Sequence, residues 1–391
     1  TDMDPIWLIV LLPLAAGSGW YFGHRKVIQA ANHEATLLPS AYFRGLNFLL
    51  NEQHDKALDV LVGALESHGD TVDVQLALGT LFRRRGELER ATTVHQNLVA
   101  REGLEPSYRL QALFELAQDY YKAGLLDRAE NLLLQVSGGR EIEESANQLL
   151  LQIYDQEKEW ERASSIARSL QGFVNNGALD GVIAQYQCEV AEAAIAAGRY
   201  QTARSNVADA LLADQDCVRA LIQSGRLDAL TNDHRSALAM WERVVQSRPE
   251  LLDEVIGLVD QSCTMLQDKT AYQGFLERYL DRNRTSTRAL MSMVDLLSSL
   301  GSGREVYRYL EDWFENNPTM VALVLLLQHR PADAGKWSTG SSQVIERMAG
   351  ELVDHDDGYE CRQCGFQGRA MHWQCPGCRH WNSILPRQLS T

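Results

Sequence analysis

The sequence lacks an excess of positive charge. Its 391 residues include 37 lysines and arginines against 52 aspartates and glutamates, a formal net charge of −15 at pH 7. A surface that repels phosphates gains nothing from counterion release, so this balance argues against general nucleic-acid binding. Only the stretch from Tyr359 to Thr391 is basic, with four arginines against one glutamate. We interpret it as a solvated surface, with an acidic partner or headgroup as the alternative.

The motifs of common catalytic chemistry are also missing. Neither G-x-x-x-x-G-K-[ST], G-x-G-x-x-G, G-x-S-x-G nor H-E-x-x-H occurs in the sequence. The nearest phosphate-loop pattern fails because Trp337 follows Lys336, and the nearest metalloprotease pattern fails because Leu37 replaces the second histidine. We therefore predict that the protein is not an enzyme and has no catalytic residues.

Cysteine is scarce outside the C-terminal tail. Cys188, Cys217 and Cys263 are scattered through sequence that is typical of helices. A buried free thiol in such a place usually acts as a small hydrophobic side chain. We expect that role for all three.

One run has no charged residue. It extends from Pro5 to Phe22, and as a helix its 18 residues would span about 27 Å, close to the ~30 Å thickness of a bilayer's hydrocarbon core. Trp7 near one end, and Trp20 and Tyr21 near the other, suit the two interfacial aromatic belts. The run predicts a transmembrane anchor over residues 5–23, followed by a juxtamembrane linker over residues 24–39.

The charges that flank this run indicate its direction. Asp2 and Asp4 precede it, while His24, Arg25 and Lys26 follow it. A cleaved signal peptide has the opposite order, and remains an alternative together with a buried core helix. The positive-inside rule predicts a single-pass protein in which everything after residue 24 lies in the cytoplasm.

The middle of the chain repeats itself at intervals near 34 residues. Tetratricopeptide repeats place a small residue at position 8 of each unit and alanine at position 20, with large apolar residues near positions 11 and 24. Alanines in the position-20 register stand at 57, 91, 129, 163, 203 and 237, separated by 34, 38, 34, 40 and 34 residues. Degenerate units follow around Ala271 and Phe275, and around Val306 and Leu310. We predict a superhelix of helical hairpins over residues 40–330, because each hairpin must stack on its neighbours to bury its apolar face. Its groove would hold peptides or helices of partner proteins.

Two C-x-x-C pairs lie near the end of the chain, after a helix and acidic hinge expected over residues 331–358. Cys361 and Cys364 form one pair, Cys375 and Cys378 the other, with ten residues between them. Two such turns can face each other to give a tetrahedral site of four sulfurs, which suits zinc, with iron as the alternative. Two disulfides would need an oxidising compartment, which the predicted cytoplasmic orientation argues against. A thioredoxin-like redox motif would need a βαβ context, which the sequence around these pairs does not predict.

We expect a small four-cysteine metal domain over residues 359–386 and a short tail over residues 387–391. Gly365 can supply the positive φ of the first turn. His372 and His380 are interpreted as surface or supporting residues, because four thiolates complete the ligand shell. A miniature core is expected from four aromatic residues, Tyr359, Phe366, Trp373 and Trp381, and docking of the two tryptophans against a helix is a secondary hypothesis.

The order of an uncharged anchor, a repeat array and the tail YECRQCGF…HWQCPGCRHWNSILP resembles the lipopolysaccharide assembly protein B family across essentially the whole chain. Both cysteine pairs, with Gly365, Phe366, Pro376 and Gly377, match the family's pattern. The resemblance implies an all-α protein with an N-terminal transmembrane helix, a tetratricopeptide superhelix and a small C-terminal rubredoxin-like zinc ribbon. Arg379 stands where rubredoxins proper carry glycine, which weakens an electron-transfer reading.

The resemblance also implies a single-pass protein of the bacterial inner membrane, with a periplasmic N-terminus and the bulk of the chain in the cytoplasm. It further implies an adaptor that restrains lipopolysaccharide synthesis. Implied partners are an FtsH-type membrane protease, the deacetylase that commits precursor to lipid A, an inner-membrane sensor that acts as antagonist, and other lipopolysaccharide assembly proteins. The adaptor would promote degradation of the deacetylase. An electron-transfer protein with iron, a nucleic-acid-binding ribbon and a scaffold for another inner-membrane complex are the alternatives.

Overall fold

The computed structural model describes residues 48, 56 and 60 and the ranges 71–173, 177–284, 286–301, 303–331 and 358–387. The expected anchor (5–23), the linker (24–39), nearly all of the first repeat and most of the hinge (331–358) lie outside these residues. Within the described part, no helix is both long and apolar enough to cross a bilayer. The chain divides into two compact units, Thr1–Glu157 and Lys158–Thr391.

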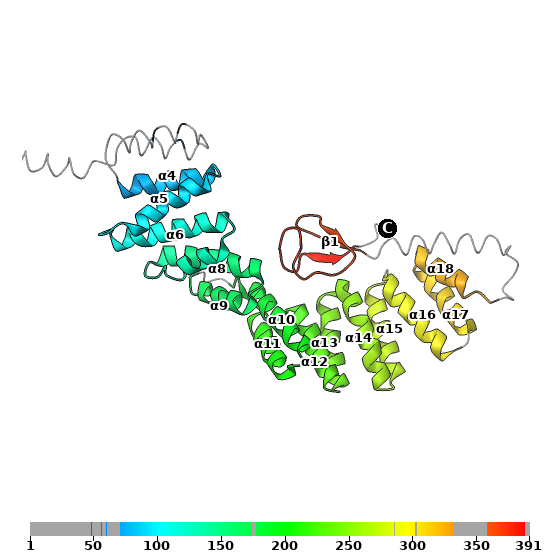
Figure 1. Ribbon diagram of the computed structural model, residues 1–391. Coiled ribbons are helices and arrows are strands. Elements are labelled where there is room, and N and C mark those ends of the chain that lie inside the picture. The colour runs from blue at the N-terminus through cyan, green and yellow to red at the C-terminus, as the bar shows by residue number, and fades with distance from the viewer. Residues whose placement is uncertain are drawn as a thin grey trace, which may run out of the picture. The chain divides into compact units, whose positions relative to one another are not determined.

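Antiparallel helices make up the described part of the first unit (Figure 1). They are α4 (Val72–Arg84), α5 (Leu88–Ala100), α6 (Pro106–Lys122), α7 (Leu126–Leu133) and α8 (Arg140–Glu157). The second unit continues with the same alternation. Its helices are α9 (Trp160–Gln171), α10 (Asp180–Ala196), α11 (Tyr200–Ala213), α12 (Val218–Leu230), α13 (His234–Ser247), α14 (Leu252–Met265), α15 (Lys269–Arg282), α16 (Thr287–Leu300), α17 (Gly303–Asn316) and α18 (Met320–Gln328), with a 3₁₀ turn, η1 (Pro249–Leu251), before α14.

Small residues let the two helices of a hairpin approach closely, as the repeat pattern predicts. The alanines at position 20 in the described residues, Ala91, Ala129, Ala163, Ala203 and Ala237, have no exposed surface. Position 8 must stay small for a second reason. A Cβ on Gly79 would lie 2.3 Å from His95 Nε2, and a Cβ on Gly225 would lie 2.4 Å from Trp241 Nε1. The large residue at position 24 therefore occupies the space that glycine leaves at position 8.

A residue in the left-handed region follows the end of six helices, α4, α6, α8, α10, α12 and α14. It stands at 86, 124, 158, 198, 232 and 267, with φ between 55° and 80°. Three of the six are glycine, but Lys158, Asn232 and Gln267 are not. Gly86 N donates to Arg83 O and Glu87 N to Phe82 O, a bond pattern that terminates a helix and reverses the chain.

The left-handed residue corrects the predicted register of the seventh repeat. In the earlier hairpins it precedes the position-20 alanine by five residues, as Asn232 precedes Ala237. Gln267 therefore places Tyr272, not Ala271, at position 20. Tyr272 is buried while Ala271 is half-buried. Leu276, with no exposed surface, takes position 24 in place of Phe275.

A small antiparallel sheet follows the helices in the second unit. Strand β1 (Tyr359–Cys361) lies between β2 (Gln367–Gly368) and β3 (Ile384–Pro386). Tyr359 pairs with both Gly368 and Pro386, and Cys361 pairs with Ile384. The helical repeat array and the small C-terminal ribbon are confirmed, so the described chain is helical except for this sheet.

Candidate metal centre and its docking on the repeats

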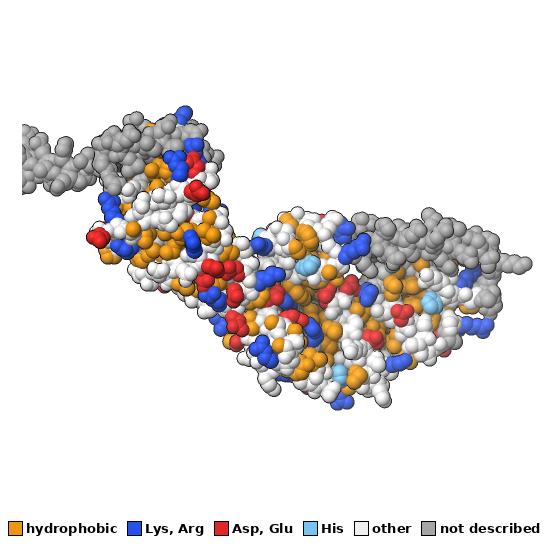
Figure 2. Space-filling model, in the orientation of Figure 1, with side chains coloured by type: hydrophobic (Ala, Val, Ile, Leu, Met, Phe, Trp, Pro, Cys, Tyr) orange, Lys and Arg blue, Asp and Glu red, His pale blue; other side chains and the backbone are white. Residues whose placement is uncertain are grey.

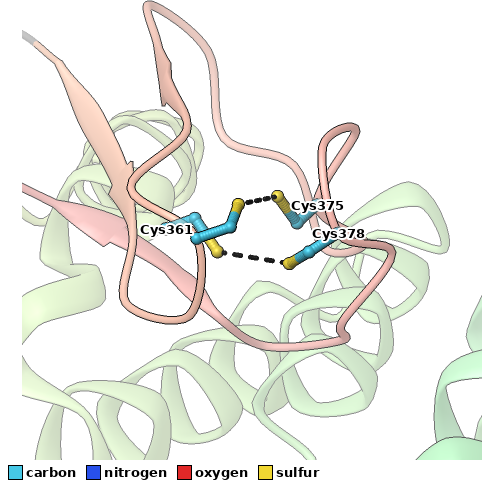
Figure 3. Close-up of side chains that lie close together, drawn as sticks. Cys361, Cys375 and Cys378 are labelled. Atoms are coloured by element: carbon cyan, nitrogen blue, oxygen red, sulfur yellow. Dashed lines mark hydrogen bonds between the residues drawn. The ribbon is translucent and has the colours of Figure 1, made fainter. Parts of the chain in front are cut away.

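The two C-x-x-C turns face each other across the ribbon. Sγ of Cys361 lies 3.7 Å from Sγ of Cys378, and Sγ of Cys364 lies 3.7 Å from Sγ of Cys375 (Figure 3). All four sulfur atoms lie within 4.8 Å of one another. A tetrahedron of four sulfurs, each about 2.3 Å from a zinc ion, has edges of about 3.8 Å. The four thiols therefore fit one metal ion, and the ribbon has a four-cysteine metal-binding site.

Local backbone geometry positions the four sulfurs. Strand β1 delivers Cys361 with 2% exposure, and Cys375 is 1% exposed. Each pair is followed by a left-handed residue, Gly365 with φ 73° and Arg379 with φ 59°. Gly365 was expected to have a positive φ, but Arg379 must adopt this conformation with a side chain. A Cβ on Gly377 would lie 3.3 Å from Cys364 Sγ, so glycine keeps the second turn close to the metal ligands.

Polar groups near Cys361 favour its thiolate form. Its Sγ lies 3.3 Å from Ser383 Oγ, and Gln363 N donates to the same sulfur at 3.4 Å. The hydrogen bond with Ser383, followed by the backbone N–H groups of the turn, lowers the pKa of Cys361 from 9.0 to about 6. Thiolates are the metal-binding form of cysteine, so Cys361 is prepared for a cation. The pKa of Cys364 is raised to about 12 and that of Cys378 is also raised, so a metal ion has to displace the protons of these two thiols.

The two nearby histidines lie outside the cluster of ligand atoms. His372 and His380 are both exposed. The His372 ring lies 6.5 Å from that of Phe366, and His380 Nδ1 lies 3.2 Å from the carbonyl oxygen of Cys378. Both positions agree with the interpretation of these histidines as surface residues.

Trp381 docks the ribbon on the repeats. Its ring lies 5.8 Å from that of Trp160 at the start of α9 and 5.9 Å from that of Tyr186 on α10, edge-to-face in both cases. Trp160 and Tyr186 stack on each other at 5.7 Å. Beside them, Gln185 Nε2 donates to Asn382 Oδ1 at 3.1 Å.

Two further contacts continue this interface along the array. The Arg219 guanidinium of α12 lies 5.8 Å from the Trp373 ring and also pairs with Glu189 at 2.8 Å. Tyr359 donates its hydroxyl to Glu254 on α14 at 2.7 Å. With Tyr186 of α10, the ribbon thus contacts the first helices of three successive hairpins.

The expected miniature core is confirmed for two of its four aromatic residues, Tyr359 and Phe366. Inside the ribbon, Cys361, Cys375 and Ile384 form the buried cluster, with Tyr359, Phe366, Met371 and Cys378 packed against it. Trp373 instead packs against the large core cluster of the repeats, together with Met371, and the buried Leu385 belongs to that cluster. Docking on helices, first treated as secondary, is the main role of Trp373 and Trp381.

A buried charged group in the first unit escaped the sequence analysis. His95 and Asp119 are both fully buried, and His95 Nδ1 lies 2.5 Å from Asp119 Oδ2. Arg83 donates to Asp119 Oδ1 at 2.8 Å and also pairs with Glu115. The three helices α4, α5 and α6 each contribute to this group. The repeat pattern gave one indication of it: His95 stands at position 24, where a large apolar residue is expected.

Charges of both signs are mixed on the repeat surface. On the face drawn in Figure 2, basic and acidic side chains of the described residues alternate without a broad basic area.

Residues 359–386 match the family described as the rubredoxin metal binding domain. Lipopolysaccharide assembly protein B of Escherichia coli K12 is 33% identical over 381 residues, 97% of each chain. The protein of that name from Haemophilus influenzae is 31% identical over 399 residues, again 97% of each chain. Among solved structures, the C-terminal part of a tetratricopeptide repeat-containing protein from Cytophaga hutchinsonii has a TM-score of 0.41 at 10% identity, covering 63% of this chain and 97% of that one. With full-length relatives at this identity, the chain belongs to the lipopolysaccharide assembly protein B family.

Proposed function

We propose that the protein is a membrane-tethered cytoplasmic adaptor that restrains lipopolysaccharide synthesis and is not itself an enzyme. In this role it brings the lipid A-committing deacetylase to an FtsH-type membrane protease, and an inner-membrane sensor opposes it. The support is the family relationship together with one observation: a metal-binding ribbon is held by aromatic and polar contacts against three hairpins of the helical repeat array. The anchor at residues 5–23 would confine both partners to one surface and so raise their effective concentration.

The ribbon's metal is proposed to be zinc with a structural role. Cys361, Cys364, Cys375 and Cys378 would hold it, and four protein thiolates leave no coordination position for water or substrate. When bound, the ion would join the two cysteine turns, which lie next in the chain to the docking residues Tyr359, Trp373 and Trp381. Metal analysis of protein purified without added metal tests this: stoichiometric zinc supports it, whereas stoichiometric iron would support electron transfer.

Cellular degradation of the deacetylase is the functional test. In cells that lack the protein, the lifetime of the deacetylase should increase severalfold, and the full chain should restore its short lifetime. A chain without residues 5–23 should restore it poorly. The His372→Ala variant serves as a matched control, because its side chain is exposed on the ribbon and outside the docking contacts. Unchanged deacetylase lifetime in all strains would refute the adaptor role.

Crosslinking from the repeat surface tests the partners directly. A photoreactive residue in place of an exposed side chain such as Gln148 on α8 should capture the protease or the deacetylase in cells. Mass spectrometry identifies the captured proteins. Capture of lipid A enzymes or the protease supports the proposal, and recovery of neither from several such positions argues against it.

A further inference from the structure

Two of the scattered cysteines meet in the structure. Cys188 lies on α10 and Cys217 immediately precedes α12, and their sulfur atoms are 4.0 Å apart. Cys188 has no exposed surface and Cys217 is 3% exposed. Small neighbours surround the pair, including Ala184, Ala191 and Ala220. A disulfide has an S–S bond of about 2.05 Å, so the two sulfurs must approach by about 2 Å to form one.

Cys217 is the better placed of the two to react. It is the N-cap residue of α12, where the positive end of a helix favours a thiolate. The pKa of Cys217 is lowered, first by the hydrogen bond from the Cys188 thiol and also by the Ala220 N–H, while the pKa of Cys188 is raised well above 9.0 by the same hydrogen bond and by burial. Gln215 and Asp216, its neighbours in the connection from α11, are exposed, so local opening of that connection brings Cys217 to solvent.

The pair is linked to the ribbon through one amide. Gln185 Nε2 lies 3.5 Å from Cys217 Sγ and 3.1 Å from Asn382 Oδ1 of the ribbon. Gln185 itself is 1% exposed. A movement of the Cys217 sulfur toward Cys188 takes away one of the two groups that hold this amide beside Asn382.

We propose that Cys188 and Cys217 are a peroxide-responsive thiol pair, which closes into a disulfide and thereby weakens the hold of α10 on the ribbon through Gln185. This inference is independent of the proposed adaptor function. It concerns cysteines outside the metal site, and the oxidant is hydrogen peroxide, which is small enough to enter a briefly opened interior.

The reaction has two steps that balance. The Cys217 thiolate attacks one oxygen of hydrogen peroxide, the O–O bond breaks, and the leaving hydroxide takes a proton to become water. This produces a sulfenic acid on Cys217. The Cys188 sulfur then attacks the Cys217 sulfur, the S–O bond breaks, and the hydroxide leaves as water with the Cys188 proton. Two thiols lose two electrons, and one peroxide is reduced to two waters.

Peptide mapping of the zinc-loaded full chain tests the bond. After peroxide treatment, alkylation of free thiols and tryptic digestion, residues 169–199 and 205–219 should appear as one disulfide-linked pair, since each peptide contains a single cysteine. Cys263 is a matched buried thiol whose pKa is raised to about 11 by burial, and it should remain alkylatable. In a Cys188→Ala variant the linked pair cannot form, and the hydrogen bond that lowers the pKa of Cys217 is lost. The Cys217 that is oxidised, more slowly than in the wild-type protein, should therefore stop at the sulfenic acid and react with dimedone.

Amide hydrogen exchange of residues 359–386 tests the link to the ribbon. Peroxide should speed this exchange severalfold more in the wild-type protein than in Cys188→Ala, which experiences the same oxidation of the metal ligands but cannot form the bond. Zinc content is measured alongside in both. Fully alkylated peptides 169–199 and 205–219 after peroxide treatment would overturn the proposal, and so would equal exchange in the two proteins despite complete linkage.

Discussion

Single residues in this fold are constrained by the size of their neighbours. A Cβ on Gly225 would lie 2.4 Å from Trp241, which is itself 1% exposed. We expect Gly225→Ala to lower the free energy of unfolding by about 1–3 kcal/mol, because the tryptophan has no room to retreat. Chemical denaturation of the two proteins measures the difference.

Gly257 on α14 is the matched control. It also lies within a first helix, but a Cβ there would meet nothing within 4 Å. Gly257→Ala should therefore raise the free energy of unfolding by about 0.5–1 kcal/mol through helix propensity. If both substitutions change the free energy of unfolding in the same direction, contact with Trp241 is not the reason that position 225 requires glycine.

Acid should release the metal, with Cys361 as a controlling group. Its pKa is lowered from 9.0 to about 6, so its thiolate contributes stability that is complete above pH 9, declines as the pH falls, and is lost below about 6. Zinc release, followed with a chromophoric chelator, should therefore increase as the pH falls. In Ser383→Ala the hydrogen bond is gone, the pKa of Cys361 rises, and release should shift to higher pH. Superimposable release curves would contradict this account.

The residues of the site could be predicted to different extents. The four metal ligands were predicted from the spacing of the two C-x-x-C pairs together with the expected cytoplasmic compartment, because a two-residue spacer places two sulfurs on one side of a turn and a reducing compartment disfavours disulfides. The pairing of Cys188 with Cys217 could not follow, since no local pattern relates residues on two different hairpins. The role of Trp381 could not be predicted either, because it depends on where the ribbon docks. The contacts of Trp381 with Trp160 and Tyr186 in the structure show that place.

At the scale of the element, hairpin geometry depends on one left-handed residue. Gln267 has φ 55° and is exposed between α14 and α15. A side chain in this region is disfavoured, so Gln267→Gly should raise the free energy of unfolding by about 0.5–1 kcal/mol despite the greater freedom of glycine in the unfolded chain. Thermal or denaturant unfolding provides the measurement. Gln267→Ala keeps the Cβ and should show no comparable gain, and equal effects of the two changes would refute the role of φ.

The ribbon should depend on Trp381 for its attachment. This side chain contacts Trp160 and Tyr186 at once, so Trp381→Ala should weaken docking by about 2 kcal/mol or more, as for other central aromatic residues of interfaces. The four cysteines should still bind metal. Faster amide exchange in β1 and β3 at unchanged zinc content is the expected signature, whereas His372→Ala should leave exchange unchanged. Loss of zinc together with docking would show that Trp381 supports the metal site instead.

The elements themselves were largely predictable. Within the described residues, the alanine spacing predicted the hairpins from Ala91 to Ala237, because a buried small residue recurs wherever two helices touch. The seventh repeat was misaligned by one residue because Ala271 imitates that signal, while Gln267, which sets the register, is not glycine. A positive φ at a residue other than glycine is difficult to predict from the sequence.

At the scale of the molecule, metal removal should separate the ribbon from the array. Structural zinc stabilises small four-cysteine units by about 10–16 kcal/mol, whereas each hairpin is supported by its neighbours. A strong chelator should therefore unfold residues 359–386 and leave most helical circular dichroism intact. Near-native helical signal with full amide exchange in the ribbon is the expected result. A parallel loss of helix would show that the array needs the ribbon to fold.

The hydrogen bond between Gln185 and Asn382 joins residues 197 positions apart, which has a consequence for the order of folding. Closing so long a loop in an unfolded chain costs roughly 5 kcal/mol of entropy, whereas hairpins form from neighbouring residues. We therefore expect the ribbon to attach late in folding. In newly made chains the helices should be complete while the surfaces of α10, α12 and α14 that the ribbon later covers are still exposed to solvent.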